Sequence, residues 1–269
     1  QVFIQILSPL HPVIDGVKNP DAYVGAIPQL FQALSLGDLT TAGLALGAIV
    51  ATLAIFGIVV FAQAMKVEIP LSFGRIRGHG IRWPLNFIYT SVIPVILVSA
   101  LVANLQLFGS MGSGGGWVSK VIPFLSNTNL LQRLVEFGWS IPPIYIIQSI
   151  TYLLFFIGAS VLFSWFWMQT SGLDPKSQAR QMMNSGLQVP GFRKDARVLE
   201  RMLKKYIYPL TIMGGIFIGF LASVADMVGA FGGGTGLLLT VMIIYKLYED
   251  IAKQHMEDMN PMLRRMMGK

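Results

Sequence analysis

The chain has 269 residues, of which 54% are hydrophobic and 12% are charged, whereas soluble domains carry about 25% charged residues. The core of a soluble protein of 269 residues could not shield so many apolar residues from water, which excludes an ordinary soluble protein. The lack of cysteine excludes disulfides and thiolate metal sites. The net charge of +7 is typical of proteins that bind nucleic acid or anionic lipid.

The chain opens inside an apolar run and without an initiator methionine. Residues 1–10 are too few for the apolar region of a signal peptide and lack its basic start. We therefore expect a truncated membrane span at this end, and a fragment of a longer protein.

Five charge-free stretches each contain the roughly 20 apolar residues that a helix needs to cross a membrane. They are residues 39–65, 83–119, 137–173, 206–225 and 227–245. The pattern predicts an all-α integral membrane protein with transmembrane helices near 42–64, 86–108, 143–168, 207–225 and 234–250.

Basic residues in the loops predict the orientation, because cytosolic loops are enriched in Lys and Arg. All but three of the 20 Lys and Arg lie in or beside loops 66–85 and 169–206 and the tail 251–269. The exceptions are Lys18, Lys120 and Arg133. If successive spans cross the membrane in alternating directions, all three lie on the side opposite to the basic loops. We expect a multi-pass protein whose two basic loops and C-terminus are cytosolic.

No predicted span has an ionisable residue in its interior, and Lys246, Glu249 and Asp250 lie at the inner, cytosolic end of the fifth. Ion-coupled carriers and pumps place such groups at the membrane midplane, so their absence argues against a carrier. The three histidines, His11, His79 and His255, are far apart and have no ligand spacing. We predict no metal site, no cofactor and no catalysis.

The glycine-rich run 232–236 is a poor candidate for a phosphate-binding loop, since Leu237 follows it where a P-loop has Lys. It predicts instead a tight turn that enters a span with close helix packing.

The first basic loop has the composition of a projecting hairpin. Glycines flank His79, and Arg75 and Arg77 alternate on one face of an extended segment. Guanidinium groups on such a finger can bind phosphates in a bidentate manner. From the residues alone, ordinary positive-inside topology or binding of lipid headgroups is the favoured explanation of this loop.

The second basic loop predicts two helices. Asp174 and Pro175 form an N-cap and a first-turn proline for a helix that could extend to Gly186. After residues 190–191, a second helix brings four basic residues together at i, i+4 spacing: Arg193, Arg197, Arg201 and Lys205. This stripe can bind RNA phosphate or anionic lipid.

Several runs in order along the chain resemble the SecY family, the main subunits of the Sec protein translocon, and its archaeal branch in particular. The runs are residues 66–71 leading into 74–78, 93–97, 170–176, 191–194 and 229–236. Together they extend the resemblance over nearly the whole chain.

The resemblance implies that the five spans are the sixth to tenth of a ten-span protein of the plasma membrane, built from two inverted-repeat halves around an hourglass pore. Such a protein passes unfolded secretory polypeptides across the membrane and releases membrane segments sideways. This chain would be its C-terminal half.

The resemblance also implies roles for particular residues. Arg75, Arg77, Arg193 and Lys194 would contact the ribosome or another cytosolic partner. Ile96 and Leu239 would belong to the hydrophobic pore ring, and Asn104 to the lateral gate.

The implied partners are the N-terminal half of the channel, small subunits of the SecE and Sec-beta type, the ribosome, nascent chains bearing signal sequences, and anionic lipid. Half of an inverted-repeat secondary transporter is the main alternative, although the uncharged spans and the basic finger count against it. A membrane scaffold that transports nothing would leave the finger unexplained.

Overall fold

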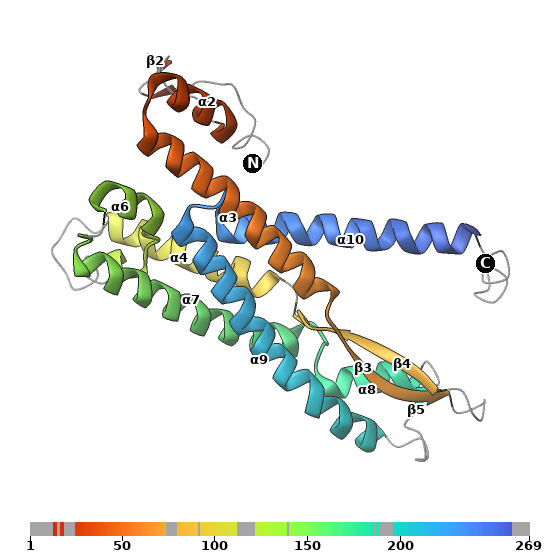
Figure 1. Cartoon of the computed structure of the whole chain (residues 1–269). Helices are drawn as coiled ribbons and strands as arrows, with labels where there is room; N and C mark the ends of the chain where they lie inside the picture. The colour runs from red at the N-terminus through yellow and green to blue at the C-terminus, as the bar shows by residue number, and fades with distance from the viewer. Residues whose placement is uncertain are drawn as a thin grey trace.

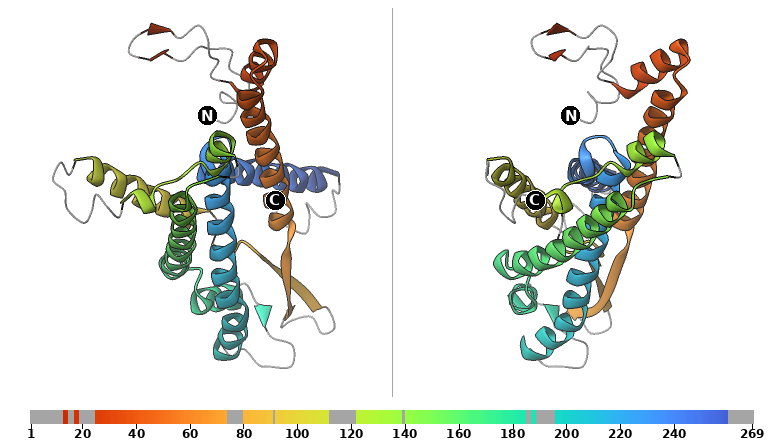
Figure 2. Two further views of the ribbon diagram at one scale, coloured as in Figure 1. Left: turned by 60° about the vertical axis from the view of Figure 1, so that its left-hand side comes forward. Right: turned by 90° about the vertical axis from the view of Figure 1, so that its left-hand side faces the viewer.

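The computed structural model describes residues 13–14, 17–18, 25–73, 80–90, 92–111, 122–138, 140–184, 187–188 and 196–259, most of which are helical. Near the N-terminus, β1 (Val13–Ile14) and β2 (Val17–Lys18) pair as a short antiparallel ladder. Figures 1 and 2 show long helices that cross one another, with a β-hairpin at one end.

A helical corner precedes the first predicted span. α2 (Ala26–Leu36) ends at Gly37, whose φ of 73° is a conformation that glycine adopts without strain. α3 (Leu39–Ala64) begins after Asp38, whose carboxylate accepts the backbone N–H groups of Thr40 and Thr41 at 3.1 and 3.3 Å. Hydrogen bonds from the Thr40 and Thr41 hydroxyls lower the pKa of Asp38 to about 2, so this cap stays ionised at neutral pH.

The hairpin follows α3 almost at once. β3 (Lys66–Phe73) pairs antiparallel with β4 (Gly80–Asn86), from Lys66 opposite Asn86 to Ser72 opposite Gly80, and β5 (Leu187–Gln188) pairs with the end of β3. These strands confirm the predicted hairpin, but Arg75 and Arg77 lie outside the described residues.

The second predicted span began too early. Residue 86 still belongs to β4, and α4 (Ile93–Met111) starts seven residues later than predicted. Residues 87–90 and 92 are uncharged but are not helical, because they close the hairpin and turn the chain. Phe87 donates its N–H to the Met65 carbonyl at 3.0 Å, which ties the end of the hairpin to the end of α3.

Among the described helices, the two that contain the third and fourth predicted spans, α7 and α9, share the most extensive contact. α6 (Leu130–Phe137) is a short helix that leads to α7 (Pro143–Thr170), which crosses α9 (Ala196–Val228). Small residues allow the close approach: a Cβ on Gly215 or Gly219 would lie within 2.9 Å of a side-chain atom of Ser164 or Ser160, respectively.

The second basic loop agrees in part with the prediction. α8 (Pro175–Asn184) begins as expected, with the Asp174 carboxylate accepting the backbone N–H of Ser177 at 3.1 Å. The predicted second helix and fourth span are instead one continuous helix, α9, with Pro209 inside it. Arg193 and Lys194 lie outside the described residues.

The helix that contains the fifth predicted span continues beyond residue 250, where that span is predicted to end. α10 (Gly233–Met259) runs as one helix from the glycine-rich turn into the basic tail. In both figures its C-terminal part extends away from the other helices.

Two clusters of buried side chains hold the helices together. The larger joins α3, α4, α7, α9 and α10, with Val98, Phe156, Ala222 and Val241 almost inaccessible to solvent. The smaller packs Ile69 of the hairpin against α8 and the start of α9. The hairpin is therefore anchored to the rest of the fold by apolar contacts.

Among the described residues, three helical stretches are long and apolar enough to cross a membrane: Leu39–Ala64, Pro143–Asn184 and Ala196–Val228. Residues Ile93–Gly109 form a shorter apolar helix. Membrane crossing by α4 and α10 stays a prediction.

Candidate functional site

The two residues predicted for a pore ring lie on the surface of the larger core cluster. Ile96 on α4 is 36% exposed, while its neighbour Val95 is 1% exposed. Leu239 on α10 is 40% exposed, next to Leu238 at 1%. At both positions, therefore, one aliphatic residue is buried in the core and the next one is partly exposed.

Leu239 also lines a pocket of about 360 Å³ between the ends of α3 and β4 and the middle of α10. We name it the Leu239 pocket; its lining residues are Gln63, Asn86, Ile88, Tyr89, Leu239, Met242, Ile243, Tyr245, Lys246 and Glu249. Its walls combine aliphatic side chains with polar groups.

Ionic and polar contacts hold the rim of the Leu239 pocket in place. Lys66 at the start of β3 lies 3.1 Å from the Glu249 carboxylate, and Lys253 lies 3.4 Å from the same oxygen. The Tyr89 hydroxyl donates to the Leu173 carbonyl at 2.8 Å. The hairpin base is thus joined to α10 on one side and to the end of α7 on the other.

Asn104, the predicted gate residue, is exposed on α4. Its side-chain amide donates to the Ala100 carbonyl of the same helix at 2.8 Å. This hydrogen bond lies within α4 and joins it to no other helix. Asn104 therefore presents a polar group on the surface of an apolar helix.

The predicted basic stripe is described for three of its four members, and Arg197, Arg201 and Lys205 are all exposed on the first turns of α9. Lys204 beside them lies 5.4 Å from the centre of the Tyr208 ring.

The structure reveals a polar junction at Asp226 that the sequence pattern did not indicate. Asp226 lies between the fourth and fifth predicted spans, in the last turn of α9. Its carboxylate accepts the Tyr152 hydroxyl at 2.8 Å and the backbone N–H of Gly234 at 2.6 Å. One side chain therefore joins α7, α9 and α10.

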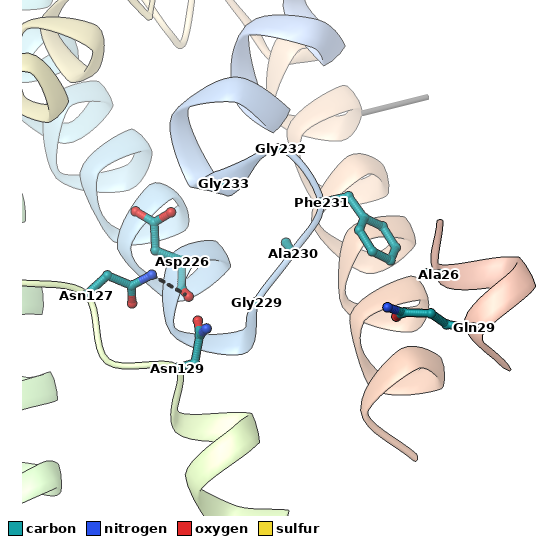
Figure 3. Close-up of a pocket in the computed structure, with 10 residues that line it drawn as sticks. All are labelled: Ala26, Gln29, Asn127, Asn129, Asp226, Gly229, Ala230, Phe231, Gly232 and Gly233. Carbon is teal, nitrogen blue, oxygen red and sulfur yellow. Dashed lines mark hydrogen bonds between the residues drawn. The ribbon is translucent and has the colours of Figure 1, made fainter. Parts of the chain in front are cut away.

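The same junction contains a polar pocket of about 360 Å³, shown in Figure 3. Asn127 donates to the Asp226 backbone carbonyl at 3.0 Å, and Figure 3 shows Gln29 and Phe231 on the opposite side of the pocket from this pair. Among the described residues, no group of three or more His, Cys, Asp or Glu could hold a metal ion.

The glycine-rich turn is built for close packing, as predicted. Gly229, Gly232 and Gly233 have φ between 68° and 81°. A Cβ on Gly234 would lie 1.9 Å from the carbonyl oxygen of Ala222, so only glycine fits between α9 and α10 at this point.

Comparison with known proteins gives the family. A family model described as SecY matches residues 3–248. The protein translocase subunit SecY of Methanococcus vannielii is 39% identical over 256 residues, covering 91% of this chain and 57% of that protein. The SecY of Pyrococcus horikoshii is 38% identical over 283 residues, covering 99% of this chain and 59% of that protein. The chain thus spans little more than half the length of these relatives.

Solved structures agree. A structure of a protein conducting channel superposes with a TM-score of 0.69 at 36% identity, over 95% of this chain and 56% of that one. The yeast Ssh1 complex bound to the yeast 80S ribosome gives a TM-score of 0.61 over 92% of this chain and 56% of that one; at 19% identity, it shares only the fold. The three apolar helical stretches and these neighbours make the chain an all-α membrane protein. With the family model matched over nearly its whole length and archaeal relatives aligned along most of it, the chain belongs to the SecY family.

Proposed function

We propose that this chain is the C-terminal half of a protein-conducting channel that passes unfolded polypeptides across the plasma membrane and releases membrane segments sideways. The observation that carries the proposal is the match of 95% of the chain to a protein conducting channel, at 36% identity. Since the chain spans only part of its relatives, the pore requires the remaining half of the channel.

In this function, Ile96 and Leu239 form part of the constriction. Both are aliphatic and partly exposed, and each follows a residue that is buried in the core. A ring of such side chains yields around a passing chain and resists ion flow by dewetting. A charge at this level would bind ions or peptide, and the charged residues nearest to Leu239 along the fifth predicted span are at its inner end, from Lys246 onward.

Photocross-linking tests the function directly. A photoreactive amino acid in place of Leu239, in the complete channel, is expected to cross-link a ribosome-stalled secretory chain. The same probe at Asn104 is expected to capture a signal sequence, because this residue is assigned to the lateral gate. Ile58 on α3, which is 45% exposed, is the matched control and should give no cross-link to the stalled chain. A channel that transports in the assay without a cross-link at Leu239 would contradict the pore assignment.

The basic loops are proposed to dock the ribosome through Arg75, Arg77, Arg193 and Lys194. Supporting observations are the projecting hairpin and its apolar anchor on α8 and α9. The exposed basic residues at the start of α9 can add contacts to ribosomal RNA or to anionic lipid headgroups.

Replacing Arg75 and Arg77 by Glu should weaken ribosome binding and flatten its salt dependence by about two phosphate contacts' worth of slope, because each guanidinium that neutralises a phosphate releases counterions. The measurement is ribosome affinity over a series of salt concentrations. Glu at both Lys176 and Arg180 on α8 is the control for charge reversal. If the two double variants have equal salt slopes, Arg75 and Arg77 do not contact the ribosome and serve only the membrane orientation of the chain.

The proposed topology has five spans, with loops 66–85 and 169–206 and the tail 251–269 in the cytosol. The chain has no native cysteine, so single introduced cysteines report accessibility cleanly. Cys at His79, Ser185 or Gly268 should be labelled from the cytosol, and Cys at Gly114 or Ser140 from the outside. A residue labelled from the wrong side would contradict the five-span topology.

Small subunits of the SecE and Sec-beta type are the proposed partners, and copurification with the complete channel tests them.

A further inference from the structure

A single acidic side chain anchors the start of α10, the helix that carries Leu239. Gly234 lies in the first turn of α10, where the backbone N–H groups have no acceptor within the helix. The Asp226 carboxylate accepts the Gly234 N–H at 2.6 Å and the Tyr152 hydroxyl at 2.8 Å. The dipole of α10 also favours a negative charge at this end. One side chain of α9 therefore joins the start of α10 to α7.

The turn that leads into α10 depends on hydrogen bonds for its position. Residues 229–233 all line the polar pocket of Figure 3, so on that side the turn faces a cavity of about 360 Å³. The Thr52 hydroxyl of α3 adds one further contact by accepting the Phe231 N–H at 3.1 Å. Apolar contacts are non-directional, whereas a hydrogen bond fixes both a distance and a direction. The hydrogen bonds at this turn therefore determine the depth and the rotation at which α10 begins.

The position of Leu239 follows from this start. Leu239 comes five residues after Gly234, which is about 7.5 Å along the axis of an α-helix. Because α10 is one continuous helix from Gly233 to Met259, a shift or rotation of its first turn also moves Leu239. A shift of about 1–2 Å, typical of helix movements, is enough to open a gap between side chains in van der Waals contact.

We propose that Asp226 is a positioning residue for the constriction. By joining Gly234 to Tyr152, it holds α10 at the depth and rotation at which Leu239 closes the resting channel. Asp226 acts only through α10 and does not itself contact the polypeptide. The inference rests on the proposed channel function and on the assignment of Leu239 to the constriction.

The test compares Asp226→Asn, Tyr152→Phe and the double variant in the complete channel. Asn keeps the shape of the side chain but loses the charge and one acceptor oxygen, and Phe keeps the ring but loses the hydroxyl. Each single variant should raise the resting conductance in planar bilayers by about two- to tenfold. The double variant should leak no more than Asp226→Asn, because the two side chains act through one hydrogen bond. Tyr152→Phe, the milder change, carries the test if Asp226→Asn does not assemble.

Spin labels report the position of α10 directly. With labels at Leu154 on α7 and Leu247 on α10, which are 63% and 59% exposed, Asp226→Asn should shift or broaden the distance distribution by about 1–2 Å. Ser223→Ala is the matched control on α9, because the buried Ser223 hydroxyl donates to the Phe220 carbonyl of the same helix at 2.9 Å. This control should change neither the conductance nor the label distance.

Leu203→Ala separates positioning from general loss of stability. Leu203 is buried in the smaller core cluster, so its truncation should lower the melting temperature in detergent and leave the conductance and the label distance unchanged. A leak in Leu203→Ala that equals that of Asp226→Asn overturns the proposal, because loss of stability alone then opens the channel.

A resting conductance that stays unchanged in both Asp226→Asn and Tyr152→Phe also overturns the proposal, and so does a leak without any change in the label distance. In these cases a leak in Leu239→Ser leaves the constriction and the channel function standing. Failure of the unmodified complete channel to transport a secretory chain counts against the channel function itself.

Discussion

Serine in place of Ile96 or Leu239 is expected to raise the resting ion leak of the complete channel severalfold. A hydroxyl in the constriction hydrates the space that an aliphatic ring keeps dry, so ions pass while no polypeptide is present. The same change should relax the selection of signal sequences, because less free energy is needed to open the constriction. The measurement is single-channel conductance in planar bilayers.

The control separates a pore position from a membrane-facing one. Ile58→Ser on α3 has a similar starting exposure, 45% against 36% for Ile96 and 40% for Leu239. A side chain that faces lipid should cost about 1–3 kcal/mol of apolar transfer at most and leave the conductance unchanged. If neither pore variant leaks more than Ile58→Ser, Ile96 and Leu239 do not form the constriction, even in a working translocon.

Gly234→Ala should destabilise the assembled helices, whereas Gly236→Ala should not. The new methyl group at position 234 would meet the Ala222 carbonyl oxygen at 1.9 Å, and nothing lies within 4 Å of a Cβ at position 236. Relief requires α9 and α10 to separate, at a cost of about 1–3 kcal/mol or more. It would also lengthen the bond from the Gly234 N–H to the Asp226 carboxylate.

The expected readout is an apparent melting temperature in detergent that falls by several degrees for Gly234→Ala. Gly236→Ala should melt at or above the temperature of the unmodified protein, because alanine favours helix over glycine by up to ~1 kcal/mol. Equal melting of the two variants would show that α9 and α10 do not approach this closely in the membrane.

Much of the local structure was predictable from adjacent residues. Asp174 and Pro175 indicated the start of α8, and the glycines around His79 indicated the hairpin whose strands are observed on either side. The start of α4 was not predictable in the same way. Residues 87–92 are uncharged, as in a span, and the turn that begins at Phe87 depends on contacts with the end of α3 and with α9.

The candidate sites likewise combine features that local sequence predicts with features that depend on long-range contacts. Leu239 could be singled out by resemblance, but its pocket depends on Gln63 and Asn86, which lie far away in the sequence. The Asp226 junction joins residues 74 positions apart, and the ion pair of Lys66 with Glu249 joins residues 183 apart. Pattern and spacing carry no signal for such contacts.

By itself, the sequence determined that the chain is a helical membrane protein, because the length and apolarity of each stretch are local properties that water and lipid act on directly. Its basic loops likewise predicted an orientation. Only the tertiary structure decided which polar residues are buried and with what partners: Asp226 with Tyr152 and Gly234, while the Gln63 side-chain nitrogen has no partner among the described residues. The reason is that burial of a polar group depends on which helices pack against it, and that packing is set by the whole chain.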